Sequence, residues 1–249
     1  MMFSSIRRAL PASVFAVLSV AALGTASANT THTAFSDIAG SAAFDGFNDL
    51  KTPRINTAGL VAGLASNVAG SAHDAKLART SGGFYPASFG LYSFSTDSTF
   101  KIDVASAIAD LGKVTLQTFV TVDTSQGVDG LLQAGYLPTL SFNGGTQALA
   151  ATSYSVTPVS GGFGMDGTPL EANPNNPNYG LFTWDLSGVQ GDVNSFRINF
   201  GLDVHSSALA FQLDQSVVAA PVPEPQTYAL MLAGMAAVGV FARRRKAQP

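Results

Sequence analysis

The chain has 249 residues, with 13 basic and 16 acidic side chains, 46% apolar residues and no cysteine. The lack of cysteine excludes disulfides, thiol nucleophiles and cysteine-ligated zinc sites. Asp supplies almost all of the acids, and 25 Gly and 12 Pro residues favour turns over helices, so the composition is typical of an all-β protein.

The first 28 residues have the features of a secretory signal peptide. Arg7 and Arg8 precede an apolar run at 11–23, and small residues follow at Ala26 and Ala28. This order of charge, short apolar core and small residues predicts cleavage after Ala28. The apolar run is too short to span a membrane comfortably. The sequence therefore predicts export, with an N-terminal signal helix that is removed.

Residues 29–220 form the predicted folded domain, and this domain is acidic. Two of the basic residues lie in the leader and four near the C-terminus, whereas Glu224 is the only acid outside the domain. The domain therefore keeps seven basic and fifteen acidic residues, a net charge of −8. A domain of this charge lacks the basic surface that nucleic acid requires, so nucleic acid is excluded as a partner.

Several segments of the domain alternate apolar and polar residues with the period of two that strands show. The clearest are 100–104, 114–122, 196–200 and 209–213, and shorter ones are 89–94, 139–142, 153–156 and 180–186. Turn sequences separate them, among them Asn143-Gly144-Gly145 and an Asn/Pro-rich stretch at 171–179 that is not expected to be regular. Short helical turns are expected only within 57–69 and 104–111. The pattern predicts an all-β fold, an antiparallel β-sandwich of jelly-roll type.

Three short motifs lie near the start, late in and at the end of the domain: Phe44-Asp45-Gly46-Phe47, Thr183-Trp184-Asp185-Leu186-Ser187 and Phe211-Gln212-Leu213-Asp214-Gln215-Ser216-Val217. Together they resemble motifs of galactose-binding-like and carbohydrate-binding jelly rolls. The resemblance implies that the first and last strands lie side by side. Gln215 stands where the closing pattern has a second acid, and the resemblance bears on architecture alone.

Catalytic motifs are missing from the sequence. It has no G-x-S-x-G elbow, no H-E-x-x-H and no P-loop. A glycan hydrolase would need two carboxylates about 5–9 Å apart, and the candidate pairs are Asp45 with Asp49 and Asp123 with Asp129. The same acids equally suit turns and an acidic surface. The sequence favours a non-catalytic protein, and a secreted glycan- or ester-directed hydrolase is the alternative.

A structural calcium site is a further use for these acids. Asp45, Asn48 and Asp49 lie in a turn-like segment, and Asp214 would face Asp45 if the first and last strands pair. Calcium takes several oxygen ligands of this kind. Without a metal, these residues would be surface turn acids. No other cofactor is expected.

Aromatic residues are the candidates for ligand binding, because flat rings suit stacking contacts. Trp184 shares its face with Phe182 and Leu186, which favours a place in the core. The remaining candidates, each near a Gly- or Pro-containing loop, are Tyr85, Tyr136, Tyr154 and Tyr179. The sequence singles out none of them, so the ligand-binding residues stay open.

Residues 221–249 form a C-terminal tail with three parts. The motif Pro223-Glu224-Pro225 interrupts regular structure. An uncharged stretch at 227–242 follows, and then the basic flank Arg243-Arg244-Arg245-Lys246. As a helix this stretch would be about 24 Å long, shorter than a bilayer core of about 30 Å. It is expected to cross the inner membrane with the basic flank snorkelling on the cytoplasmic side.

Motif, apolar helix and basic flank together resemble the PEP-CTERM sorting domain. In that family a membrane protease, exosortase, recognises the tail and cleaves it near the motif, and the hosts are typically Gram-negative bacteria that make extracellular polysaccharide. The resemblance implies an exported protein that is anchored transiently in the inner membrane. It would then lie at the cell surface or outside the cell, associated with extracellular polysaccharide or biofilm matrix. An ordinary tail anchor behind a Pro-rich linker is the alternative.

Overall fold

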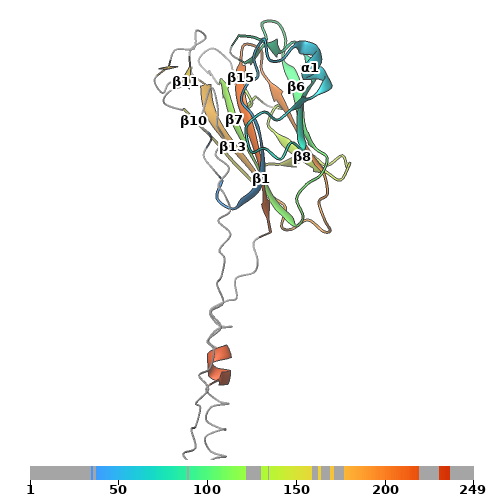
Figure 1. Cartoon of the computed structure of the whole chain (residues 1–249), viewed down its shortest axis with the longest axis vertical. Helices are drawn as coiled ribbons and strands as arrows, with labels where there is room; N and C mark the ends of the chain where they lie inside the picture. Colours follow the sequence, from blue (N-terminus) through green and yellow to red (C-terminus); the bar gives the residue numbers. More distant parts are fainter. Residues whose placement is uncertain are drawn as a thin grey trace, which may run out of the picture.

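A computed structural model of the chain describes residues 35, 38–88, 90–121, 130–133, 135–158, 162–163, 169–170, 177–218 and 230–235. Their strands build two antiparallel sheets that pack face to face (Figure 1). The predicted all-β sandwich is therefore confirmed.

The larger sheet, sheet A, has seven strands. In spatial order they are β10 (Ser153–Pro158), β13 (Pro177–Asp185), β7 (Leu111–Thr121), β15 (Ser207–Val217), β5 (Leu91–Tyr92) and β4 (Tyr85–Pro86), and β1 (Ser41–Phe47) also pairs with β15. The second sheet, sheet B, has six strands. They are β2 (Leu64–Ala65), β3 (Ala75–Gly82), β6 (Ser98–Val104), β14 (Phe196–Leu202), β8 (Thr139–Phe142) and β9 (Leu149–Ala150). A separate ribbon consists of β11 (Gly162–Phe163) and β12 (Pro169–Leu170).

The first and last strands of the body lie side by side, as the motif resemblance implied. β1 runs antiparallel to β15, with Phe47 opposite Phe211 and Phe44 opposite Asp214. β7 pairs with the other edge of β15 over most of its length. The closing strand is therefore held on both sides in the middle of sheet A.

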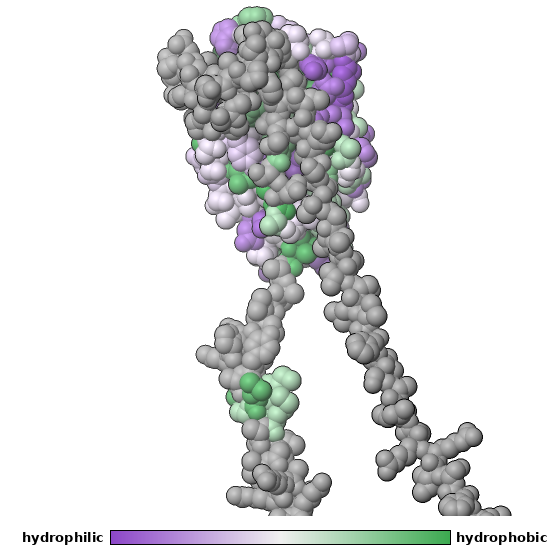
Figure 2. Space-filling view, turned by 60° about the vertical axis from the view of Figure 1, so that its left-hand side comes forward, coloured by the Kyte–Doolittle hydropathy of each residue, from purple (hydrophilic) through white to green (hydrophobic). Residues whose placement is uncertain are grey.

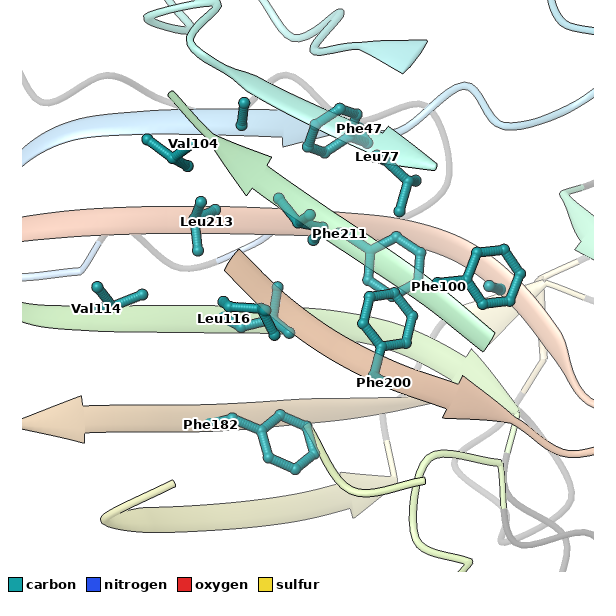
Figure 3. Close-up of a cluster of buried hydrophobic side chains, with 14 of the residues drawn as sticks. Phe47, Leu77, Phe100, Val104, Val114, Leu116, Phe182, Phe200, Phe211 and Leu213 are labelled. Atoms are coloured by element: carbon teal, nitrogen blue, oxygen red, sulfur yellow. The ribbon is translucent and has the colours of Figure 1, made fainter. Parts of the chain in front are cut away.

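The main core fills the space between the two sheets, and apolar side chains from both meet there (Figure 3). The rings of Phe100 and Phe200, from neighbouring strands of sheet B, stack with centroids 5.5 Å apart. Phe200 in turn contacts Phe211 of sheet A at 5.2 Å. The alternation predicted for 100–104 and 196–200 is confirmed, because every second residue of these strands is buried.

A β-bulge in β15 changes the face on which one predicted core residue lies. The pairing with β7 shifts between Ala208 and Ala210, and a bulge adds one unpaired residue. Leu209 therefore leaves the face of Phe211 and Leu213 and joins a second buried cluster that contains Phe44. The expectation that residues 209, 211 and 213 share one face was wrong, because the alternation of side chains restarts at the bulge.

The only helix in the described part of the body is α1 (Thr57–Ala62), inside one of the two expected segments. The side chain of Asn56 caps it by accepting a hydrogen bond from the amide of Gly59 at 2.8 Å. The helical turn expected within 104–111 was wrong. There the amide of Ala107 donates to Asn194, and the amide of Ile108 to the side chain of Gln215, so both amides bond to distant partners.

Two further strand assignments differ from the sequence expectation. β3 was not predicted, although Lys76 is exposed between the buried Ala75 and Leu77 as in a half-buried strand. β13 begins at Pro177, inside the Asn/Pro-rich stretch that was expected to be irregular. Asn178 pairs with Val120 of β7 on one side and with Pro158 of β10 on the other. Strand pairing on both sides therefore outweighs the tendency of an Asn/Pro-rich sequence to form turns.

The signal peptide with Ala26 and Ala28, the motif Pro223-Glu224-Pro225 and the basic flank Arg243–Lys246 lie outside the described residues. Residues 230–235, within the expected apolar stretch, are helical, and their exposed apolar side chains form the green segment of Figure 2. Across the residues that the structure describes, no helix has the length and apolarity needed to cross a membrane, so the expected transmembrane helix is not supported there.

Candidate functional site

Four aromatic side chains gather at one edge of sheet A, and we call them the aromatic cluster: Tyr85, Tyr92, Phe94 and His205. Tyr85 of β4 and Tyr92 of β5 are direct cross-strand partners, which places their side chains next to each other. Phe94 follows two residues after Tyr92, and His205 lies in the turn before β15. The pairing of β5 with the start of β15 brings Tyr92 and His205 together across 113 residues of sequence.

Three rings of the aromatic cluster, those of Tyr92, Phe94 and His205, contact one another, and Phe94 and His205 are exposed while Tyr92 is half-buried. The centroids of Tyr92 and Phe94 are 4.5 Å apart in a T-shaped pair, and His205 lies 6.4 Å from each of them. The hydroxyl of Tyr92 is 3.2 Å from Nδ1 of His205. Phe94 is 64% exposed, although a large aromatic side chain gains most when it is buried. An exposed ring packed beside other aromatic side chains makes this edge of the sheet a candidate interaction site.

The turn that carries His205 is held in an unusual conformation. His205 has φ of 66°, in the left-handed region that residues other than Gly rarely adopt. Its amide donates a hydrogen bond of 3.0 Å to the carbonyl of Ser93, which lies between Tyr92 and Phe94. One bond therefore ties the His205 turn to the loop that presents Phe94.

The side chain of Asp97 holds the same turn in place through hydrogen bonds. Its Oδ1 accepts a hydrogen bond from the amide of Val204 at 3.0 Å, and its Oδ2 accepts one from the hydroxyl of Tyr136. The bond from Tyr136 is the main cause that holds the pKa of Asp97 below its usual value. Burial and the bond to Asp97 raise the pKa of Tyr136 to about 12. Tyr136, a candidate for ligand binding, thus has a hydroxyl that positions the neighbouring turn.

The chemistry of the aromatic cluster suits an uncharged, polyhydroxylated ligand that also has an apolar face. Burial, and next the neighbouring Tyr85, raise the pKa of Tyr92, so its phenol stays protonated at neutral pH. Phe94 offers an exposed ring, while the Tyr92 hydroxyl and the His205 ring can donate or accept hydrogen bonds. A sugar ring presents a C–H face for stacking and hydroxyls at its rim, so these side chains match it in both respects.

The other aromatic candidates have different environments. Trp184 is 1% exposed and its indole N–H donates to the carbonyl of Leu149 at 3.0 Å, which confirms the core position expected from the spacing. Tyr154 is 55% exposed and stacks on Phe182, with centroids 5.6 Å apart. Among the described residues, the ring next to Tyr154 is that of the buried Phe182, so Tyr154 has no exposed ring beside it there.

Asp45, Ser66 and His73 form a hydrogen-bonded trio beside β1, in which Asp45 and Ser66 are buried and His73 is exposed. Oδ1 of Asp45 accepts hydrogen bonds from the Ser66 hydroxyl at 2.6 Å and from the His73 amide at 2.8 Å. Nδ1 of His73 lies 3.0 Å from the Ser66 hydroxyl. Burial raises the pKa of Asp45, and the bonds from Ser66 and from backbone amides oppose this shift. In a nucleophilic triad the histidine stands between serine and acid, whereas here the serine stands between them.

This order of hydrogen bonds gives the trio a structural role, and we call Asp45, Ser66 and His73 the clasp because they join two segments of the chain. Ser66 has one hydroxyl proton, and it donates that proton to the carboxylate of Asp45. The hydroxyl oxygen then accepts from His73, so the imidazole is not placed to remove the proton. Ser66 is 6% exposed and Asp45 1%. The trio therefore fastens the segment around residues 66–73 to β1.

The predicted calcium ligands do not converge. Asp214 shares a face of sheet A with its cross-strand partner Phe44. Asp45 follows Phe44 directly, and successive side chains of a strand point to opposite faces, so Asp45 and Asp214 lie on opposite sides of the sheet. The expectation that they would face each other was wrong, since the register aligns Asp45 with Leu213.

The remaining calcium candidates are also engaged elsewhere. Oδ1 of Asn48 accepts a hydrogen bond from Asn67 at 2.6 Å, and a carboxylate oxygen of Asp49 lies 3.9 Å from Nε of Arg54. Within the described part of the chain, no three acidic or histidine side chains are grouped so that they could hold a metal ion. The second carboxylate pair proposed for a hydrolase, Asp123 with Asp129, lies outside the described residues.

Asp214 belongs to a buried polar network on the outer face of sheet A. Its Oδ2 accepts hydrogen bonds from the side-chain amides of Gln117 at 3.0 Å and Gln212 at 3.3 Å. The hydroxyl of Tyr179 donates to Oε1 of Gln117 at 2.6 Å. Burial, and next the charge of Asp214, raise the pKa of Tyr179 to about 12. Tyr179, another ligand-binding candidate, is thus committed to this network.

Sequence reasoning identified Tyr85 but missed the rest of the aromatic cluster. Tyr92 and Phe94 are two residues apart within a segment expected to be a strand, so the period of two could have placed them on one face. His205 has no such local signal, because only the pairing of β15 with β5 brings it to Tyr92.

The comparison with protein families identifies the C-terminal tail. Residues 221–246 match the family described as PEP-CTERM protein-sorting motif. No curated protein and no solved structure matches the chain. The motif indicates an exported surface protein that an exosortase processes, and it implies a transient membrane anchor before processing.

Proposed function

We propose that this protein, once exported and processed, binds extracellular polysaccharide through the aromatic cluster at the cell surface or in the surrounding matrix. The exposure of Phe94 beside Tyr92 and His205 is the observation that carries the proposal. The sorting motif at 221–246 supports the location, since it implies an exported protein. The contact of Phe94 with two neighbouring rings distinguishes it from a single scattered apolar residue and supports a role in binding.

We further propose that binding is the whole activity of the domain. The order of bonds in the Asp45, Ser66 and His73 clasp supports this, because it gives the serine no general base. A hydrolase acting on glycans or esters is the second candidate, since the fold does bring these three residue types together. Release of p-nitrophenol from its acetate ester, abolished by Ser66→Ala, or release of reducing ends from a glycan, abolished by Asp45→Asn, would favour the hydrolase.

The binding proposal is tested by retention on the extracellular polysaccharide of the source organism. The full-length chain, purified in mild detergent, should be retarded on the immobilised polymer, and the double variant Tyr92→Ala/Phe94→Ala should elute earlier. Tyr154→Ala removes one exposed ring from another edge of the same sheet, so it is the matched control and should elute as the wild type does. No retention of the wild type, or equal retention of all three proteins, would refute the proposal.

Processing is tested on the C-terminus of the protein recovered from cells. Mass spectrometry should find molecules that end close to Pro223-Glu224-Pro225 and lack Arg243–Lys246. Recovery of the intact basic end on every molecule would argue against cleavage by exosortase and for a permanent anchor.

A further inference from the structure

The outer face of sheet B carries a row of basic side chains on an otherwise acidic domain. Lys76 of β3, Lys101 of β6 and Arg197 of β14 point away from the core, since Leu77, Ile102 and Ile198 beside them are fully buried. The register aligns Lys76 and Arg197 with Asp103 between them. These three are among the seven basic residues of a domain with fifteen acids. We call them the basic row.

Asp103 organises the basic row without neutralising it. One of its carboxylate oxygens lies 2.8 Å from Nζ of Lys101, and the other accepts from Nε of Arg197. Burial works to raise the pKa of Asp103, but the bonds from Arg197 and Lys101 outweigh it and lower that pKa, so the group stays ionised. One acid against three cations leaves this face positive. Weak exposed ion pairs of this kind also exchange partners easily.

Arg197 keeps the part of its side chain that recognises carboxylates. Its bond to Asp103 uses Nε, and its side chain is 48% exposed. Among the described residues, none is a hydrogen-bond partner of its two terminal nitrogens. The guanidinium group can therefore bind an external carboxylate while Asp103 stays in place.

A groove of about 400 Å³ lies next to Arg197 on the same face. Its lining includes Ser141, Gly144 and Ser195, which leave room for a ligand close to the backbone. Asn143 shapes the wall, because its Oδ1 accepts from the amides of Asn194 at 2.8 Å and Ser195 at 3.3 Å. The groove is therefore formed before any ligand arrives, and its volume is in the usual range for a small-molecule site.

We propose that this groove and the basic row bind acidic sugar residues of an anionic polysaccharide. The proposal rests on the proposed function and narrows its ligand to carboxylate-bearing polymers. The hydroxyls and backbone of the groove suit the sugar, and Arg197 with Lys76 suits carboxylates spaced along a chain. The net charge of −8 over the domain repels a polyanion at long range, but screening confines that repulsion to about 8–10 Å at physiological salt. At the basic row itself, the local attraction by the three cations therefore outweighs the repulsion from the more distant acids, so we expect a polyanion to bind there and not elsewhere on the domain.

The test uses polygalacturonate as the anionic probe and dextran as the neutral one, with the full-length chain in mild detergent. The wild type should bind polygalacturonate at 50 mM salt and release it near 0.5 M. Lys76→Gln/Arg197→Gln should weaken binding about five- to tenfold, as expected for the loss of two exposed charge contacts. The matched control, Lys51→Gln/Lys113→Gln, removes the same charge from outside the basic row and should bind as the wild type does. Arg197→Lys keeps the positive charge but loses the paired N–H donors of the guanidinium group, so its affinity should lie between those of the wild type and the double variant.

Several results would overturn the proposal. The first is an equal loss of affinity for polygalacturonate in the control variant Lys51→Gln/Lys113→Gln. The second is binding of dextran as strong as that of polygalacturonate, or no binding of polygalacturonate at all. The third is salt-sensitive self-association of the protein that Lys76→Gln/Arg197→Gln abolishes. The outcome is separable from that for the aromatic cluster. Phe94-dependent retention on the native polysaccharide with no affinity for polygalacturonate would refute only the basic-row site. Arg197-dependent binding of polygalacturonate with no effect of Phe94→Ala on the native polymer would refute only the aromatic site.

Discussion

Replacing Phe94 by Ala isolates the contribution of one exposed ring to polysaccharide binding. Phe94 is 64% exposed, and a large aromatic side chain offers about 200 Å², so about 130 Å² is open to a ligand. A sugar that stacks on one face would cover about half of this area. At about 25 cal/mol per Å², that burial is worth about 1.6 kcal/mol, or roughly 15-fold in Kd. We therefore expect Phe94→Ala to raise the Kd by about that factor.

The measurement is a titration of the native polysaccharide into the wild type, Phe94→Ala and Phe94→Tyr, followed by calorimetry. Phe94→Tyr keeps the ring face and should change the Kd by less than about twofold, since only an added hydroxyl at the rim differs. The variants should remain folded, because changes at exposed positions usually alter stability by less than about 0.5 kcal/mol, and the lost ring contact with Tyr92 adds about 1.5 kcal/mol at most.

Two results would refute the reasoning. An unchanged Kd for Phe94→Ala would show that the exposed ring does not contact the polymer. An equal loss in Phe94→Ala and Phe94→Tyr would show that the effect comes from disturbance of the loop rather than from stacking. A fall in stability well above about 2 kcal/mol in Phe94→Ala would point to the same conclusion.

Three further substitutions test the structural roles assigned above. Tyr136→Phe removes the donor to Asp97, so urea denaturation should show a loss of about 1 kcal/mol. The stability from the lowered pKa of Asp97 is present above the unfolded value of 3.8 and lost as pH falls through the folded one. The stability difference between the wild type and Tyr136→Phe should therefore shrink as pH falls below 3.8, and a difference that does not depend on pH would contradict the bond. Trp184→Phe should cost about 2 kcal/mol by circular dichroism, because a cavity forms and the carbonyl of Leu149 loses its donor; a neutral effect would contradict the core assignment. The raised pKa of Asp45 makes its contribution largest below 3.8 and lost as pH rises through the folded value, so the stability of the wild type relative to Asp45→Asn should fall as pH rises, and a constant difference would contradict the raised pKa.

Local sequence patterns correctly predicted the strands that have one face toward the core and the other toward solvent along their whole length. Residues 100–104 and 196–200 alternate because a strand exposes its two faces with a period of two, and in the structure one face is the core and the other is solvent. Trp184 followed from the same rule, since Phe182 and Leu186 share its face. The sorting tail was also readable directly, because exosortase recognition depends on a contiguous segment.

The sequence pattern failed to predict the position of a side chain where pairing with a distant strand decides which face of the sheet that side chain lies on. The bulge beside Leu209 arises in the register with β7, which no residue near position 209 reveals. The predicted pairing of Asp45 with Asp214 required adjacent strands, which was right, and the same face, which depends on a register shift of one residue. A single step of register separates a shared metal site from two acids on opposite sides of a sheet.

The amino-acid sequence by itself determined that this protein is exported, carries a sorting tail and folds as an all-β domain, because charge order, contiguous motifs and strand periodicity are local properties. The tertiary structure alone decided which side chains form surfaces. His205 meets Tyr92 across 113 residues, and Lys76 aligns with Arg197 only through Asp103 on the strand between them. Both arrangements depend on strand pairing, whose register is set by the packing of the whole sandwich.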